Sequence, residues 1–241
     1  MSEPSPTPTP KPILRRPGLL RFSAVELLLA LVFVIISAPF IETFTYGQVV
    51  EPVLMTLVLV LAVFAVGGNR RTLIGAILLV IPALVGRWLY HLNPDLLSVE
   101  IHRIAELVFL GYVVGHLLRF ILRAPRVNAE VLCAGISGYL LLGIIWMVAY
   151  MLVARTAPDA FTYTAGPASQ HSMDGFNAFY FSFATITTVG YGDIVPISKA
   201  ARMLSVVESV TGLFYVAIVI SRLVAHYSSN PPPEPRGSED R

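Results

Sequence analysis

The sequence predicts an all-α membrane protein with six transmembrane helices and a shorter, re-entrant helix between the fifth and the sixth. Hydrophobic residues make up 55% of the 241 residues and charged residues only 13%, about half the charged fraction of a typical soluble domain. A soluble monomer could not bury that much apolar surface. Several apolar segments also approach the roughly 20 residues that span a bilayer core.

Each predicted transmembrane helix corresponds to one apolar segment. In chain order these segments are 24–41, 50–66, 72–89, 104–122, 129–153 and 200–225. The segment 175–187 is apolar too, but its length of about 13 residues is below that of a span. Such a half-length helix is tolerated at membrane depth only where protein surrounds it, so we predict that it is re-entrant.

The two ends of the chain differ in composition from the apolar segments. Residues 1–22 and 228–241 are rich in proline and poor in apolar residues, which predicts disordered tails. Between them we expect a four-helix transmembrane domain at 23–127 and a second module at 128–227, with no soluble regulatory domain in this chain. The start also resembles a signal peptide, but its apolar run exceeds the usual length.

Charges distribute unevenly between the two sides of the predicted membrane. Most basic residues fall on the side of the two termini: Lys11, Arg15, Arg16, Arg21, Arg70, Arg71, Arg119, Arg123, Arg126 and Arg222. The positive-inside rule makes that side cytoplasmic. We therefore expect a multi-pass protein of the cytoplasmic membrane with both termini in the cytoplasm.

Composition also excludes several functions. The formal net charge of +2 is too small and dispersed for a nucleic-acid partner. Cys133 is the only cysteine, so one chain can build neither a disulfide framework nor a cysteine-rich metal site. The five histidines show no metal-ligand spacing and no phosphate loop or nucleophile motif occurs, so we expect no enzyme. His91 and His102 are expected in the loop between the third and fourth spans. There they would either be solvated loop residues or sense pH or zinc.

The segment after the short helix reads Thr187-Thr188-Val189-Gly190-Tyr191-Gly192-Asp193. We call residues 188–192 the TVGYG loop. Glycine adopts positive φ at little steric cost, which allows successive carbonyls to turn toward one axis. The loop resembles the selectivity filter of potassium channels. The resemblance covers about residues 129–227. This segment is similar to the pores of bacterial six-span channels that lack a sensor domain.

This resemblance implies a site and an assembly. Carbonyl oxygens of Thr188, Val189, Gly190 and Tyr191, with the Thr188 hydroxyl, would hold potassium ions as the permeant ligand, with no other cofactor. Val189 and Tyr191 would pack away from the axis, and Gly192 would complete the loop. A closed ring needs four copies, which implies a homotetramer in the lipid bilayer, with segment 175–187 as its pore helix.

Residues around the loop extend the pattern and depart from it. Thr187, Tyr180 and Asp193 are expected to support the filter, with a hydrogen bond from the Tyr180 hydroxyl to Asp193. Ala184 stands where some potassium channels carry a glutamate, so no carboxyl pair with Asp193 is available. Gly212 stands at the position of a gate hinge, but it is equally typical of close helix packing.

Glu208 is an ionisable residue in the middle of a predicted span, which is costly and suggests a function. Two interpretations are open. It is either a charge near a cation-filled cavity or a carboxylate that hydrogen-bonds the hydroxyls of Ser182 or Thr185 on the short helix.

The expected function is a potassium-selective channel that conducts passively, with a weakly selective cation channel or a potassium transporter subunit as alternatives. A non-conducting structural subunit is a further alternative. Voltage sensing is not expected, because residues 104–118 of the fourth span carry no basic residue except His116, and steep voltage dependence needs several charges within the field.

Overall fold

The computed structural model describes residues 24–41, 47–66, 70–93, 99–124, 127–167 and 171–229. These residues form long helices, one half-length helix and two three-residue strands. In chain order the elements are α1 (Ala24–Ile41), α2 (Gly47–Val66), α3 (Arg70–Leu92), α4 (Val99–Arg123), α5 (Ala129–Thr156), β1 (Phe161–Tyr163), α6 (Gly175–Ile186), β2 (Ile194–Pro196) and α7 (Lys199–Ser229).

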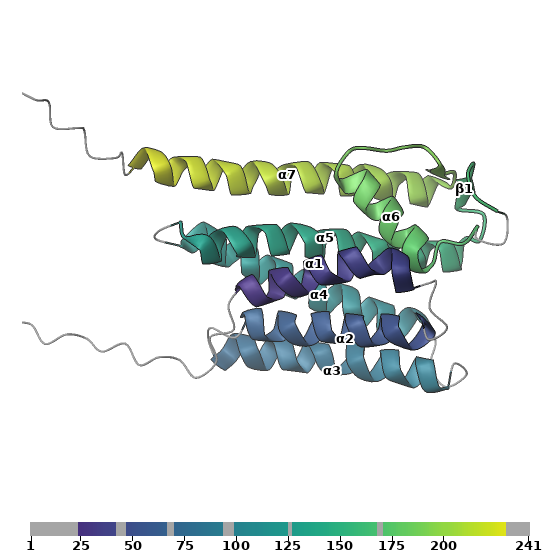
Figure 1. Ribbon diagram of the computed structural model, residues 1–241, viewed down its shortest axis with the longest axis horizontal. Coiled ribbons are helices and arrows are strands. Elements are labelled where there is room, and N and C mark those ends of the chain that lie inside the picture. The colour runs from purple at the N-terminus through teal and green to yellow at the C-terminus, as the bar shows by residue number, and fades with distance from the viewer. Residues whose placement is uncertain are drawn as a thin grey trace, which may run out of the picture.

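The long helices run side by side along the longest axis of the molecule (Figure 1). Helix α5 lies between the α1–α4 bundle and α7, and it contacts α1, α4, α6 and α7. The short helix α6 is tilted and lies at one end of the molecule, beside β1. We call this end, which holds α6, β1 and β2, the α6 end.

Every apolar segment predicted to be helical is helical in the structure. Helices α3, α4, α5 and α7 are long and apolar enough to cross a membrane, whereas the apolar parts of α1 and α2 are shorter, at Ala24–Phe40 and Pro52–Val66. The protein is therefore a membrane protein with four candidate spans in its described part, and six crossings stay a prediction. The predicted disordered tail 1–22 lies outside the described residues, as do residues 230–241 of the predicted tail 228–241. Residues 228 and 229 were predicted to be disordered but belong to α7, because the helix continues past its apolar segment.

Local sequence explains how α5 and α6 begin. The Asn128 side chain accepts a hydrogen bond from the Val131 amide at 3.0 Å and so caps α5. Asp174 is extended and Gly175 has a φ of 49°, which turns the chain into α6. The sequence predicts no strand, yet β1 and β2 pair antiparallel, with Tyr163 opposite Ile194. This pairing joins the segments on either side of α6.

The core lies around α5. Within the apolar spans, 61% of α5 is buried but only 17% of α7. Tyr150 of α5, Phe161 of β1 and Phe181 of α6 pack edge to face, with ring centroids 4.8 to 5.9 Å apart. Such aromatic contacts add to the apolar area that they bury. The cluster fixes α6 against α5 at the α6 end.

Candidate functional site

The backbone of the TVGYG loop alternates in conformation. The φ angles of Thr188, Gly190 and Gly192 are 62°, 53° and 81°, whereas Val189 and Tyr191 do not have positive φ. The expected positive φ at both glycines is confirmed. Left-handed Thr188 costs about 1–3 kcal/mol, a strain that is typical of functional sites.

Hydrogen bonds to α6 fix the direction of the loop. The Gly190 amide donates to the Ala184 carbonyl at 3.0 Å, and the Thr188 amide donates to a carbonyl in the last turn of α6 at 2.9 Å. In a trans peptide the preceding carbonyl points opposite to the N–H. The carbonyls of Thr187 and Val189 therefore point away from α6. The Thr187 hydroxyl adds a 2.6 Å hydrogen bond to the Phe183 carbonyl.

The far end of the loop is held by Tyr180. Its hydroxyl donates to Asp193 Oδ2 at 2.8 Å, so the predicted hydrogen bond is confirmed. The Tyr180 ring also stacks on Tyr191, with centroids 6.2 Å apart and planes inclined by 9°. Burial and the hydrogen bond to Asp193 raise the pKa of Tyr180 to about 12, so its hydroxyl stays a donor at neutral pH.

The TVGYG loop is uncovered in the single chain, because each of residues 188–192 is exposed. Val189 is 52% exposed and Tyr191 74% exposed. Helix α7 is uncovered as well, because exposed apolar residues recur along it every three or four positions, including Met203, Val206 and Val210. One chain therefore presents a polar loop and an apolar helix face that it does not cover itself.

Glu208 lies at the junction of α5, α6 and α7 with no exposed surface. Ser182 Oγ is 2.6 Å from its Oε1 atom, and the Tyr150 hydroxyl donates to its Oε2 atom. A fully buried side chain cannot face a cavity, so the cavity interpretation is wrong. The alternative is confirmed for Ser182, while the structure pairs the second carboxyl oxygen with Tyr150 of α5, which the sequence did not indicate.

Gly212 lies against the end of α6. A Cβ atom at this position would lie 2.5 Å from Ile186 Cγ1 and 3.1 Å from the Ile186 carbonyl oxygen. Contacts below 3 Å between packed atoms cannot be accommodated without movement. The close approach of the two helices therefore explains this glycine by packing, and α7 is continuous through it. A hinge at Gly212 stays a prediction.

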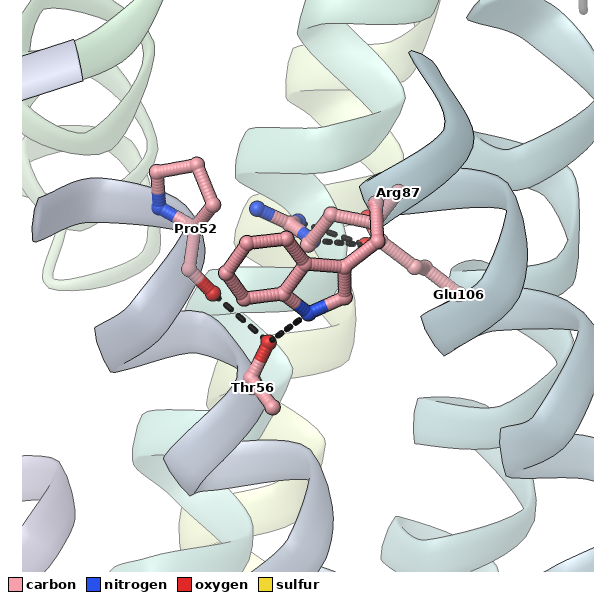
Figure 2. Close-up of polar contacts among 5 residues, drawn as sticks. Pro52, Thr56, Arg87 and Glu106 are labelled. Carbon is pink, nitrogen blue, oxygen red and sulfur yellow. Dashed lines mark hydrogen bonds and ion pairs between the residues drawn. The ribbon is translucent and has the colours of Figure 1, made fainter. Parts of the chain in front are cut away.

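A buried ion pair inside the α1–α4 bundle was missed from the sequence. Arg87 of α3 contacts the Glu106 carboxylate of α4 through Nε and Nη2, at 2.7 and 2.5 Å (Figure 2). Glu106 is 2% exposed. The available signal was an acidic residue within the predicted fourth span, which by default suggests a function or a partner. Beside the pair, the Trp88 indole donates to Thr56 Oγ1 at 3.2 Å.

Two other arginines link the bundle to the rest of the chain. Arg103 of α4 donates to the Met151 carbonyl of α5 at 3.1 Å and lies 3.8 Å from the carboxylate of Asp174, the residue before α6. At the opposite end, Arg222 of α7 donates to the Ala124 carbonyl just after α4, at 2.7 Å. Helix α4 is therefore bonded near both of its ends to the elements that hold the TVGYG loop.

The loop position predicted for His91 and His102 is wrong. His91 lies in the last turn of α3, and His102 is a buried residue of α4 that is 6% exposed. Gly86 of α3 explains the burial, because a Cβ there would lie 2.5 Å from His102 Cβ. Among the described residues, no three His, Cys, Asp or Glu side chains are grouped so that they could hold a metal ion.

Comparisons with known proteins match the part of the chain that contains this site. Residues 140–228, from α5 to α7, match a family model described as "Ion channel". A segment of 53 residues, 22% of this chain, is 43% identical to "Two-pore potassium channel 4" of Arabidopsis thaliana and covers 19% of that protein. A segment of 86 residues, 34% of this chain, is 34% identical to "Two pore potassium channel c" of Oryza sativa subsp. japonica and covers 18% of it.

A bacterial relative is similar over a shorter segment. "Voltage-gated potassium channel Kch" of Escherichia coli (strain K12) is 46% identical over 48 residues, which are 17% of this chain and 12% of that protein. The chain thus spans less than a fifth of the length of each of these relatives. No solved structure matches it significantly. The resemblance to the potassium channel superfamily is therefore confirmed, and the family match that supports it includes α6, the TVGYG loop and α7.

Proposed function

We propose that the chain is the subunit of a homotetrameric, potassium-selective channel of the cytoplasmic membrane. In this proposal the chain crosses the membrane six times, both termini are cytoplasmic, and α6 is the pore helix. Potassium passes down its electrochemical gradient through a ring formed by four TVGYG loops. The protein is then a channel and not an enzyme.

The observation that carries the proposal is the direction of the loop carbonyls. The Thr187 and Val189 carbonyls point away from α6, and residues 187–192 are exposed in the single chain. Unpaired backbone groups cannot face lipid, so irregular backbone at membrane depth must be enclosed by protein or line a water-filled path. Four copies around one axis provide both, because each loop then faces the other three.

A carbonyl ring suits potassium because its oxygens replace the water shell of the ion without adding fixed charge. The sites lie between Thr188 and Tyr191, and the Thr188 hydroxyl completes the innermost one. Helix α6 ends at the loop, so its C-terminal partial negative charge favours a cation beyond it. Tyr180 and Asp193 brace the outer end, and Thr187 braces the inner end.

The α1–α4 bundle serves as a scaffold for the pore in this proposal. Between Arg103 and Arg119, helix α4 contains no lysine or arginine. Each elementary charge that crosses a potential of 100 mV contributes only about 2.3 kcal/mol, so several would be needed for steep voltage dependence. The bonds from Arg103 to α5 and toward α6 also favour a fixed position.

The test is the reversal potential of the purified full chain in planar bilayers under a potassium-to-sodium gradient, with barium added as a blocker. We expect reversal near the potassium equilibrium potential and an assembly of four chains by native mass spectrometry. Reversal near zero would indicate a weakly selective cation channel, which Ala184 in place of a carboxylate favours. An assembly other than four chains would refute the ring.

A further inference from the structure

The buried carboxyl of Glu208 joins the three helices α5, α6 and α7. Its Oε1 atom contacts the Ser182 hydroxyl of α6 and its Oε2 atom contacts the Tyr150 hydroxyl of α5, while the residue itself belongs to α7. Ser182 Oγ also lies 2.8 Å from the Gly143 carbonyl of α5. Three short oxygen contacts therefore meet in one place.

Each of these three contacts needs one hydrogen atom between its two oxygens. Tyr150 and Ser182 have one hydroxyl hydrogen each, and the Gly143 carbonyl has none. Two hydrogens cannot fill three contacts, so the third belongs to the carboxyl of Glu208. Glu208 then donates to Ser182, Ser182 donates to the Gly143 carbonyl, and Tyr150 donates to the other oxygen of Glu208.

The surroundings of Glu208 agree with an uncharged group. Its hydrogen-bond partners are Tyr150 from α5 and Ser182 from α6, and Tyr150 also contacts Ser205 of α7. The phenol of Tyr139 from α5 lies near it as well and is neutral at neutral pH. Within the part of the chain that the structure describes, no lysine, arginine or histidine forms an ion pair with it. Burying an ionised carboxylate without a cation is far more costly than burying a neutral acid.

Ser182 connects this cluster to the TVGYG loop. It lies two residues before Ala184, whose carbonyl accepts the hydrogen bond of the Gly190 amide. We propose that Glu208 is a positioning residue: as a neutral carboxylic acid it fixes α6 between α5 and α7, and α6 in turn fixes the loop. This inference rests on the proposed channel function, because the loop is its point of action.

Two substitutions separate the charge of Glu208 from its hydrogen bonds. Glu208→Gln has the shape of the neutral acid, and its amide can donate to Ser182 while its carbonyl accepts from Tyr150. Glu208→Leu fills a similar volume without polar atoms, and a buried ionisable group is often replaced in this way without loss of the fold. Glu26→Gln, at an exposed position at the start of α1, is the matched control.

The first measurement is the infrared difference spectrum of the full chain in lipid. We expect a carbonyl band of a protonated carboxylic acid in wild type and Glu26→Gln that is absent in Glu208→Gln. If Glu208→Gln removes a carboxylate band instead, Glu208 is ionised and the inference is overturned. This result does not depend on conduction, so it stands even if the chain passes no potassium current.

The second measurement is the current in planar bilayers. Glu208→Gln should keep the wild-type reversal potential and inactivate within twofold of the wild-type rate. Glu208→Leu should assemble normally but inactivate at least tenfold faster or lose selectivity. Equal behaviour of Glu208→Leu and wild type would overturn the positioning role. If Glu208→Leu fails to assemble, Tyr150→Phe is measured in its place, because it removes only the hydroxyl that donates to Glu208. It too should inactivate faster or lose selectivity, and wild-type behaviour would overturn the positioning role.

Discussion

Substituting Gly190 with alanine isolates the contribution of backbone conformation to the carbonyl ring. Its φ of 53° is disfavoured for a residue with a Cβ. Apart from Gly190 and its two chain neighbours, no heavy atom of the described residues lies within 4 Å of where that Cβ would be. The penalty is therefore conformational, about 1–2 kcal/mol for each chain. In the proposed ring of four chains the penalties add to about 4–8 kcal/mol, which would lower the population of the proposed conducting arrangement roughly a thousandfold or more.

The assay is the reversal potential and conductance under a potassium-to-sodium gradient. Gly115→Ala in α4 is the matched control, because it makes the same chemical change in a helix with open space around the new methyl group. That change should stabilise the helix by up to about 1 kcal/mol and leave the current unchanged. Selective current from Gly190→Ala would refute the reasoning, and so would an equal loss in Gly115→Ala.

Four further predictions concern Tyr180, the Arg87–Glu106 pair and Gly212. Tyr180→Phe removes the donor to Asp193, weakens the loop by about 1–2 kcal/mol for each chain and should speed inactivation; unchanged current decay would count against the bond. The pKa of Tyr180 is raised to about 12, so its hydroxyl stays protonated and keeps the bond to Asp193 below about pH 10, and the bond is lost only as the pH rises through about 12. Changing the pH from about 7 to about 10 should therefore leave the current decay unchanged through this group. Arg87→Leu should cost about 3–5 kcal/mol, seen as a lower Tm in detergent, because the buried Glu106 carboxylate loses its 2.5 Å contact with the guanidinium. A second change, Glu106→Leu, should recover much of that loss, and a double variant no more stable than Arg87→Leu would contradict the pairing. Gly212→Ala places a Cβ 2.5 Å from the last residue of α6, so it should lower the Tm as well, whereas a Tm at the wild-type value would show that the contact is relieved at no cost.

The helices could be predicted because their signal is local. An apolar run with a length near that of a bilayer core identifies a span without knowledge of its neighbours, and residues 24–41 match α1 in both bounds. The positive φ of Gly190 and Gly192 was predictable because glycine tolerates that conformation. Tyr180 and Asp193 could be paired because both lie beside the motif.

Other features depend on which helix faces which, and a single sequence does not carry that information. The partners of Glu208 are 26 and 58 residues away along the chain, and only the one on α6 was anticipated. Arg87 and Glu106 lie 19 residues apart, so their pairing depends on how α3 packs against α4. The left-handed conformation of Thr188 was not predicted, because threonine rarely adopts it.

The contacts of Arg103 have a consequence for exchanging parts between relatives. The guanidinium on α4 donates to the Met151 carbonyl and lies near Asp174, so it belongs physically to the module that follows it. A chimera joined between α4 and α5 would take Arg103 away from the Met151 carbonyl and from Asp174. Both groups would then face a helix from another protein. Moving α4 together with α5–α7 keeps the contacts of Arg103, but it separates the buried Glu106 of α4 from Arg87 of α3. The donor helix at the position of α3 would then have to supply a cation beside Glu106.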